Sequence, residues 1–307
     1  MPRSFRGLWP AMFTPLTESG EPNLAETEKL VDLFVRQRLD GIYLLGSTGQ
    51  GPLLSVAQRQ AVAECTIKAA AGRIPVMLHV GAVSTEDSIT LAKHGAKIGA
   101  DALSSVGPIY YRVPPDAVFE HYRRIGSAAD LPFFVYHLSL VNTLSLGGRD
   151  YVDRLLALPN VAGMKFTDRD LFQLGLLCTY GGDRFQVFSG ADEVLCHAAV
   201  CGTVGAIGTF YNVWGPACQA ARAAFVGEMN SAGSVEAGYK FMTAFQVALD
   251  EVLSSGGTWP FLRSAMQIKY NIDIGPCRAP LGASDKPWKP ADVERVLEMV
   301  DAAAPGA

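Results

Sequence analysis

The chain has 307 residues, of which 49% are hydrophobic and 18% charged, a globular composition that excludes a largely disordered protein. The formal net charge is −4 without a basic run, and no apolar stretch approaches the roughly 20 residues that span a bilayer, so neither nucleic acid nor a membrane is an expected partner. Six scattered cysteines and an N-terminus without the apolar region of a signal peptide predict a cytoplasmic protein with free thiols.

Short apolar runs alternate with helix-like stretches over the first two thirds of the chain. The expected strands cover residues 7–15, 41–49, 74–81, 101–108, 131–138, 161–167, 184–190 and 203–210. The stretches between them cover residues 23–38, 55–71, 85–98, 115–129, 148–157, 170–180 and 192–201. Such alternation is typical of a parallel sheet, and eight units predict an α/β fold of the (β/α)8 TIM-barrel type. A doubly wound open sheet is the alternative, although no G-x-G-x-x-G fingerprint follows the first strand.

After Trp214 the pattern changes to helices only, over residues 216–230, 235–254, 260–270 and 290–304. We interpret the first of these as the last barrel helix and the others as a C-terminal helical extension. No low-complexity linker separates the two parts, so residues 1–213 and 214–307 are expected to form one continuous domain.

The sixth expected strand carries a lysine, Lys165, between Met164 and Phe166. A lysine is rarely buried unless it is paired or functional, and desolvation favours its neutral amine, which can attack a carbonyl carbon. The structural alternative is that Lys165 extends from the end of the strand to water.

Further candidate catalytic and binding residues are expected at the C-terminal ends of the strands, where barrel active sites lie. They are Ser47, Thr48, Tyr110, Tyr136, Thr167, Gly190, Asp192, Glu193 and Thr209. No histidine or cysteine cluster suits a metal, so this inventory predicts carbonyl chemistry through an imine, without a separate cofactor. Lys165 would attack the carbonyl, Tyr136 would relay the proton, and the turn at Ser47 and Thr48 would hold a carboxylate.

These residues also have structural alternatives. A tyrosine at a strand end is more often a packing residue, and adjacent Asp192 and Glu193 cannot both point the same way along an extended chain. A helix N-terminus accounts for at least one of the two acids without a function. His79 is expected to be structural, and His137 to point toward the helices.

Taken together, five stretches resemble one enzyme family, the pyruvate-dependent class I aldolases that include N-acetylneuraminate lyase and dihydrodipicolinate synthase. The stretches are Gly-Ser-Thr-Gly at 46–49, Tyr136, Gly-Met-Lys-Phe-Thr at 163–167, Ser-Gly-Ala-Asp-Glu at 189–193 and Gly-Thr-Phe-Tyr-Asn at 208–212. The resemblance implies a homotetrameric barrel in which Lys165 forms a Schiff base with pyruvate and Tyr136 relays protons. It also implies that Ser47 and Thr48 bind the pyruvate carboxylate, and that Tyr110 reaches into the site of a neighbouring subunit.

Within the family the sequence is most similar to the sialic acid lyase branch. That branch uses its Gly-x-Asp-Glu stretch, here Gly190, Asp192 and Glu193, to hold sugar hydroxyls, and Thr209 would take the place of its sugar-binding serine. The resemblance implies cleavage of N-acetylneuraminate to pyruvate and a sugar aldehyde, N-acetylmannosamine. Dihydrodipicolinate synthases carry an arginine where this chain has Val141, so the clamp for a second carboxylate is missing.

Two departures leave other substrates open. The glutamate that the family places after Gly-Ser-Thr-Gly is Gln50 here, and the stretch from Ser139 to Thr143 matches no branch well. The alternatives are a 2-keto-3-deoxy sugar acid aldolase, a hydroxy-oxoglutarate aldolase or a dihydrodipicolinate synthase-like enzyme. The alternative that is not an enzyme is a non-catalytic barrel that binds a sugar acid.

Overall fold

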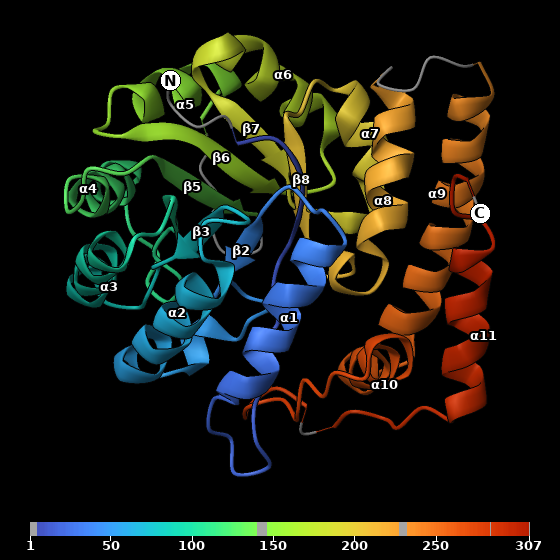
Figure 1. Cartoon of the computed structure of the whole chain (residues 1–307). Helices are drawn as coiled ribbons and strands as arrows, with labels where there is room; N and C mark the ends of the chain where they lie inside the picture. The colour runs from blue at the N-terminus through green and yellow to red at the C-terminus, as the bar shows by residue number, and fades with distance from the viewer. Residues whose placement is uncertain (1–4, 140–145, 227–231, 283, 307) are drawn as a thin grey trace.

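The computed structural model describes residues 5–139, 146–226, 232–282 and 284–306. Within them eight parallel strands form one sheet in the order β1-β8-β7-β6-β5-β4-β3-β2 (Figure 1). The strands are β1 (Gly7–Pro10), β2 (Ile42–Leu44), β3 (Val76–His79), β4 (Ala102–Val106), β5 (Phe133–Leu138), β6 (Val161–Thr167), β7 (Gln186–Ser189) and β8 (Gly205–Gly208).

The sheet closes on itself between its first and last members. Ala11 forms a parallel bridge with Tyr43, and the amide of Met12 donates to the Tyr43 carbonyl at 2.9 Å. The expected (β/α)8 barrel is therefore confirmed, and the doubly wound open sheet is wrong.

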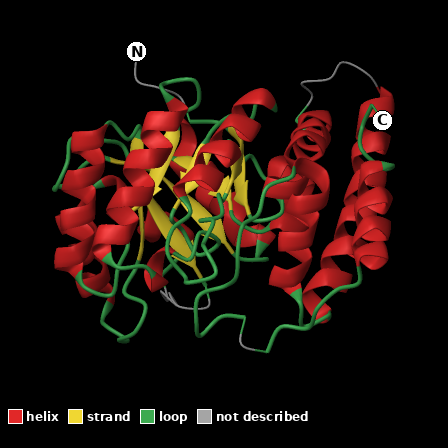
Figure 2. Cartoon of the chain, turned by 60° about the horizontal axis from the view of Figure 1, so that its bottom comes forward, coloured by secondary structure: helices red, strands yellow, loops and turns green. Residues whose placement is uncertain are grey.

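Helices follow the strands and surround them (Figure 2). They are α1 (Leu24–Arg36), α2 (Val56–Ala70), α3 (Thr85–Ile98), α4 (Pro115–Gly126), α5 (Gly148–Leu156), α6 (Leu171–Gly181), α7 (Leu195–Val200) and α8 (Tyr211–Phe225). Ser55 caps α2 in a capping box with Gln58, because each side chain bonds the other's backbone N–H. Ser84 accepts from the Asp87 amide and so begins α3.

All the strands except β6 are shorter than the sequence predicts, most of all β1 and β2 at their C-terminal ends. β1 ends at Pro10 rather than at residue 15, and β2 ends at Leu44 rather than at residue 49. Leu45 and Gln50 both have left-handed backbone, with φ of 60° and 53°, which is incompatible with an extended strand. The apolar pattern thus continues into a turn.

Side chains alternate between two apolar cores, because successive strand residues point to opposite faces. One cluster fills the barrel lumen, and its members include Trp9, Tyr43, Phe134, Phe188 and Ile207. The other, which contains Met164 and Phe166, lies between the strands and the helices. Lys165, between those two outward residues, must point into the lumen.

A helical extension follows the barrel, as expected, and stands to one side of it (Figure 2). It contains α9 (Ala232–Ser254), α10 (Thr258–Tyr270) and α11 (Pro290–Asp301). Phe245 of α9 contacts Phe210 and Trp214, and Trp259 of α10 contacts Phe13. This shared core supports the prediction that residues 1–213 and 214–307 form one domain.

The last barrel helix begins earlier than predicted, at Tyr211 rather than at Pro216. Trp214 interrupts it with non-helical backbone, and the Pro216 ring accounts for a break at this point because proline has no N–H to continue the ladder. Residues 227–230 of the predicted helix lie outside the described residues.

Candidate active site

Lys165 lies near the C-terminal end of β6 with only 5% of its surface exposed. It pairs in register with Tyr136 on β5 and with Phe188 on β7. Its Nζ atom is 4.4 Å from the centroid of the Tyr136 ring and 4.6 Å from that of Tyr43. The side chain therefore stays inside the lumen instead of extending to water.

The turn after β2 has an unusual backbone conformation. Leu45 has a left-handed conformation, and its carbonyl lies 3.2 Å from Nδ1 of buried His79. A Cβ atom at Gly51 would lie 1.9 Å from the same carbonyl, so only glycine fits there. Ser47 is exposed at the turn, and the hydroxyl of Thr48 is 2.7 Å from that of Thr209 after β8. The turn thus meets the end of the last strand.

Gln50, the departure from the family's glutamate, has a structural role. Its side chain is 1% exposed, and its oxygen accepts from the backbone N–H of Arg278 at 2.7 Å. The Arg278 guanidinium donates to the carbonyls of Leu53 and Gly20. Gln50 therefore fastens the turn to the segment that follows α10.

Asp192 is a buried carboxylate that follows the C-terminal end of β7. Its two oxygens accept from the backbone N–H groups of Phe210, at 3.0 Å, and Thr209, at 3.2 Å. Burial raises the pKa of Asp192 to about 6, against the opposite effect of those two amides. A Cβ atom at Gly208 would lie 2.3 Å from the carboxylate, so that glycine makes room for it. Asp192 consequently fixes the end of β8 as well as facing the site.

Glu193 has other partners than Asp192, but both residues lie in a 3₁₀ helix (Asp192–Val194) and not in the extended chain that the alternation argument assumed. Its carboxylate accepts from Nε of Arg169 at 2.7 Å, and its backbone carbonyl accepts from Gln246 at 2.6 Å. Arg169 follows β6 and is itself largely exposed. Glu193, which is expected to hold sugar hydroxyls, is thus already paired with Arg169 at the C-terminal rim of the barrel.

Thr167 and Gly190 lie directly beside the lysine. The Thr167 hydroxyl is buried, and the described residues offer it no hydrogen-bond partner. A Cβ atom at Gly190 would lie 1.9 Å from that hydroxyl and 2.9 Å from Cε of Lys165. The chain at this point therefore packs too closely against Lys165 and the buried Thr167 hydroxyl for any residue larger than glycine.

Tyr110 is not part of this cluster. It lies between β4 and α4, is 78% exposed, and contacts Tyr111 with ring centroids 5.0 Å apart. Its expected place in a neighbouring subunit's site stays a prediction.

The stretch from Ser139 to Thr143 is described only at its start. The hydroxyl of Ser139 donates to the Thr167 carbonyl at 3.3 Å, and residues 140–143, with Val141, lie outside the described residues. His137 points toward the helices as predicted, with Nδ1 3.2 Å from the hydroxyl of Tyr151 on α5. Burial lowers the pKa of His137 to about 4.

Sequence reasoning missed Tyr43, which packs against the lysine from β2. The alternation of side chains along a strand could have identified Tyr43, because it points into the lumen like the inward-facing residues of the other strands. His79 is structural, as expected: the Val106 amide donates to its Nε2 at 3.1 Å. Its ring nevertheless borders Tyr43 and Tyr136, at 6.0 Å from each.

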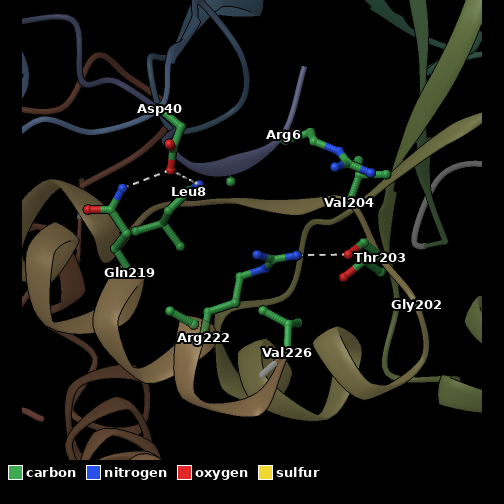
Figure 3. Close-up of a pocket in the computed structure, with 11 residues that line it drawn as sticks. Arg6, Leu8, Asp40, Gly202, Thr203, Val204, Gln219, Arg222 and Val226 are labelled. Carbon is green, nitrogen blue, oxygen red and sulfur yellow. Dashed lines mark hydrogen bonds between the residues drawn. The ribbon is translucent and has the colours of Figure 1, made fainter. Parts of the chain in front are cut away.

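A cavity of about 340 Å³ lies at the opposite end of the barrel, where β1 and β8 begin (Figure 3). Its polar groups are used in closing that end: Arg222 donates to the Thr203 carbonyl at 2.8 Å, and Asp40 accepts from the amide of Leu8 and from Gln219. Arg222 also sits in the last turn of α8, where a cation complements the helix dipole. The cavity is thus separate from the Lys165 site.

Other sites are not indicated within the described ranges. No group of three or more His, Cys, Asp or Glu side chains there is placed to hold a metal ion. None of the helices in that part of the chain is both long and apolar enough to cross a bilayer.

The closed barrel with a buried lysine at its catalytic end defines the class of protein, a (β/α)8-barrel enzyme. The chain matches the model of the dihydrodipicolinate synthetase family over residues 4–298. An N-acetylneuraminate lyase of Escherichia coli (strain SMS-3-5 / SECEC) is 30% identical over 291 residues, which cover 94% of this chain and 95% of that protein.

Solved structures agree with this match. The wild-type sialic acid aldolase of Ruminococcus gnavus has a TM-score of 0.88 at 25% identity, covering 97% of this chain and 98% of that one. An N-acetylneuraminate lyase from Mycoplasma synoviae has a TM-score of 0.83 at 29% identity, with 97% and 98% covered. The chain belongs to the dihydrodipicolinate synthetase family. The resemblance seen in the sequence is confirmed, and so is the prediction of a lyase-type enzyme.

Proposed function

We propose that the protein is a class I aldolase that reversibly cleaves N-acetylneuraminate to pyruvate and N-acetylmannosamine through an imine on Lys165. The observation that carries this proposal is the burial of Lys165 in the lumen, beside Tyr136 on the neighbouring strand. An amine in such a place is a nucleophile for a carbonyl carbon. The relatives reported above are named N-acetylneuraminate lyase and sialic acid aldolase, which favours the same substrate here.

In the cleavage direction the amine of Lys165 attacks the C2 carbonyl of the open-chain sugar acid. The carbonyl oxygen leaves as water, with one proton from the amine and one from an acid, and an iminium remains. A base then removes the C4 hydroxyl proton, the C3–C4 bond breaks, and the electron pair is taken up by the iminium to give an enamine. Protonation at C3 and hydrolysis release pyruvate and restore the amine. Tyr136 is proposed to move these protons because its ring contacts the Lys165 amine.

The remaining site residues are proposed to orient the two halves of the substrate. Ser47 and Thr48 would hold the carboxylate next to C2, at the turn after β2. The sugar half would contact residues from β6, β7 and β8, namely Thr167, Gly190, Asp192, Glu193 and Thr209. No separate cofactor enters the proposed reaction.

A second candidate keeps the chemistry and changes the aldehyde. The Arg169 guanidinium bound to Glu193 places a cation at the rim where a neutral sugar would bind. The N–H groups that Arg169 does not use on Glu193 favour a hydroxy-oxoglutarate, whose far end carries a second carboxylate. This candidate is a hydroxy-oxoglutarate aldolase.

We also propose a homotetramer in the cytoplasm. Large apolar side chains are exposed on several elements, among them Tyr110, Phe172 and Tyr239, and subunit contacts would cover such surface. All six cysteines are free thiols, as suits a reducing compartment. Sedimentation at the mass of a monomer would contradict the assembly and the proposed role of Tyr110.

The imine is tested by incubating the enzyme with pyruvate and sodium borohydride, followed by intact mass and peptide mapping. Wild type should gain one reduced pyruvate on Lys165, and Lys165→Ala should gain none and lose at least about a thousandfold in turnover. Lys269→Ala is the matched control, since Lys269 is also partly buried but pairs with Asp301 on α11. An adduct on another lysine, or turnover retained by Lys165→Ala, would contradict the mechanism.

The substrate is tested separately with a panel of 2-oxo acids. N-acetylneuraminate should give the highest kcat/KM under the first candidate. Turnover of a shorter 2-oxo diacid with none of N-acetylneuraminate would establish the second candidate instead.

A further inference from the structure

The charged end of Lys165 lies in a corner between two aromatic rings. Its Nζ atom is 4.6 Å from the centroid of Tyr43 and 4.4 Å from that of Tyr136. The planes of these rings meet at 82°, with their centroids 6.2 Å apart. In the described part of the chain Lys165 has no ion pair within 4.0 Å, although the Asp192 carboxylate interacts with it electrostatically. The faces of two rings are thus in contact with its charged end.

The two rings belong to a fixed group of three, which we call the three-ring cluster: Tyr43 on β2, His79 on β3 and Tyr136 on β5. His79 lies 6.0 Å from each of the other two rings. The Val106 amide donates to His79 Nε2, so Nδ1 carries the proton and donates to the Leu45 carbonyl. All three side chains are almost completely buried. The cluster therefore cannot turn away from the lysine without disrupting three strands.

The Tyr43 hydroxyl is occupied elsewhere. It lies 3.0 Å from the hydroxyl of Ser104 on β4, and both side chains are fully buried. Burial, and after it the nearby Tyr136, raises the pKa of Tyr43 well above its ordinary value. Tyr43 therefore stays neutral and is not a proton carrier, which leaves the face of its ring as the part that meets Lys165.

We propose that Tyr43 is a positioning residue for the imine step, whose ring face holds the Lys165 amine and stabilises the positive charge of the iminium formed on it. This inference rests on the proposed aldolase function. Cations are attracted to the face of an aromatic ring, most strongly where water is excluded. The iminium suits this environment because it keeps the positive charge but has at most one N–H left to donate.

The charge is present at defined steps. When Nζ bonds to the carbonyl carbon and water departs, the nitrogen of the iminium carries the net positive charge that entered with the proton. The ring face stabilises that state and the starting ammonium, but not the neutral amine. Loss of the ring should therefore lower both the yield of iminium and the pH at which the amine becomes reactive.

The experiment compares Tyr43→Phe with Tyr43→Leu in the full chain. Borohydride trapping with pyruvate is followed by mass as a function of pH, and kcat and KM are measured alongside. Tyr43→Phe keeps the ring and should trap pyruvate within about threefold of wild type. Tyr43→Leu should trap it on the order of tenfold less, with the half-maximal pH of trapping lowered by about one unit. Phe134→Leu, also in the lumen, is the matched control and should leave that pH unchanged.

A second comparison covers the case in which Tyr43→Leu does not fold. Trifluorinated phenylalanine at position 43 keeps the shape of phenylalanine but weakens the negative ring face, so trapping should fall in the same direction as for leucine. Equal trapping and equal pH midpoints for phenylalanine and its fluorinated form would overturn the inference. So would a loss in Tyr43→Phe as large as in Tyr43→Leu, since the hydroxyl would then be the active part. Failure of wild type itself to trap pyruvate would reject the aldolase proposal instead.

Discussion

Replacing Gly190 by alanine tests how closely the barrel packs around its lysine. A Cβ atom at this position would lie 1.9 Å from Thr167 Oγ1 and 2.9 Å from Lys165 Cε. Cβ contacts under 3.0 Å are essentially never observed, so either neighbour has to move. Lys165 is confined by the rings of Tyr43 and Tyr136, and Thr167 lies in the continuous strand β6. The added methyl therefore perturbs the reacting amine.

The size of the effect follows from the displacement. Thr167 Oγ1 must retreat by roughly 1 Å, and a misplacement of about that size beside the reacting groups costs about a hundredfold in rate. That corresponds to about 2.7 kcal/mol in the activation barrier. Overpacking costs about 1–3 kcal/mol of stability, which a domain of ordinary stability survives. We expect Gly190→Ala to fold, with kcat/KM lowered about a hundredfold.

The assay combines kcat/KM, borohydride trapping with pyruvate, and thermal unfolding. Gly175→Ala is the matched control, since Gly175 lies in α6 and a Cβ atom there has nothing within 4 Å. Alanine in a helix should stabilise that variant by up to about 1 kcal/mol and leave turnover unchanged. Wild-type kcat/KM in Gly190→Ala would refute the packing argument.

Three further predictions concern charge and capping. Burial raises the pKa of Asp192 to about 6 in the folded protein. As the pH rises from about 4 through 6 the carboxyl therefore ionises first in the unfolded chain, and wild type loses stability relative to Asp192→Asn. We expect the free energy of unfolding of wild type, measured with urea relative to that of Asp192→Asn, to fall by about 2.4 kcal/mol from pH 4 to pH 7. A difference that does not depend on pH would contradict the assignment. Arg169→Gln should leave the unfolding temperature nearly unchanged, since the pair with Glu193 is largely exposed, but should raise kcat/KM for N-acetylneuraminate relative to a 2-oxo diacid. An unchanged ratio would show that the rim cation does not select the substrate. Ser55→Ala should cost about 1 kcal/mol of stability through loss of the capping box on α2, with activity retained, and equal denaturation midpoints would argue against that cap.

The order and number of the strands could be predicted because each is a short apolar run between turn residues. The ends of the strands could not, since apolar residues continue into turns. Leu45 is the instructive case: it extends the apolar pattern of β2, yet its backbone is left-handed and its carbonyl is held by His79. A contact from another strand decides that conformation, and no pattern within residues 41–49 contains it.

The site was predictable to the extent that it depends on strand position. Lys165, Tyr136, Thr167 and Thr209 all lie at the expected end of the barrel. The partners of the charged groups were not predictable, because they come from distant segments. Glu193 binds Arg169, and Asp192 binds two amides that begin α8.

Strand parity explains why, among the residues that the structure describes, the lysine has aromatic neighbours and no bound carboxylate. Moving two residues along a strand keeps a side chain in the lumen but raises it by one layer. The apolar lumen residues Trp9, Phe134, Phe188 and Ile207 are followed two positions later by Ala11, Tyr136, Gly190 and Thr209. Gly163 is followed in the same way by Lys165, so the amine lies in the layer of side chains directly above the apolar layer of the lumen. A carboxylate in contact with Nζ would favour the ammonium strongly at every step. Ring faces stabilise a cation more weakly and do not take its proton, which suits the imine step proposed for this lysine.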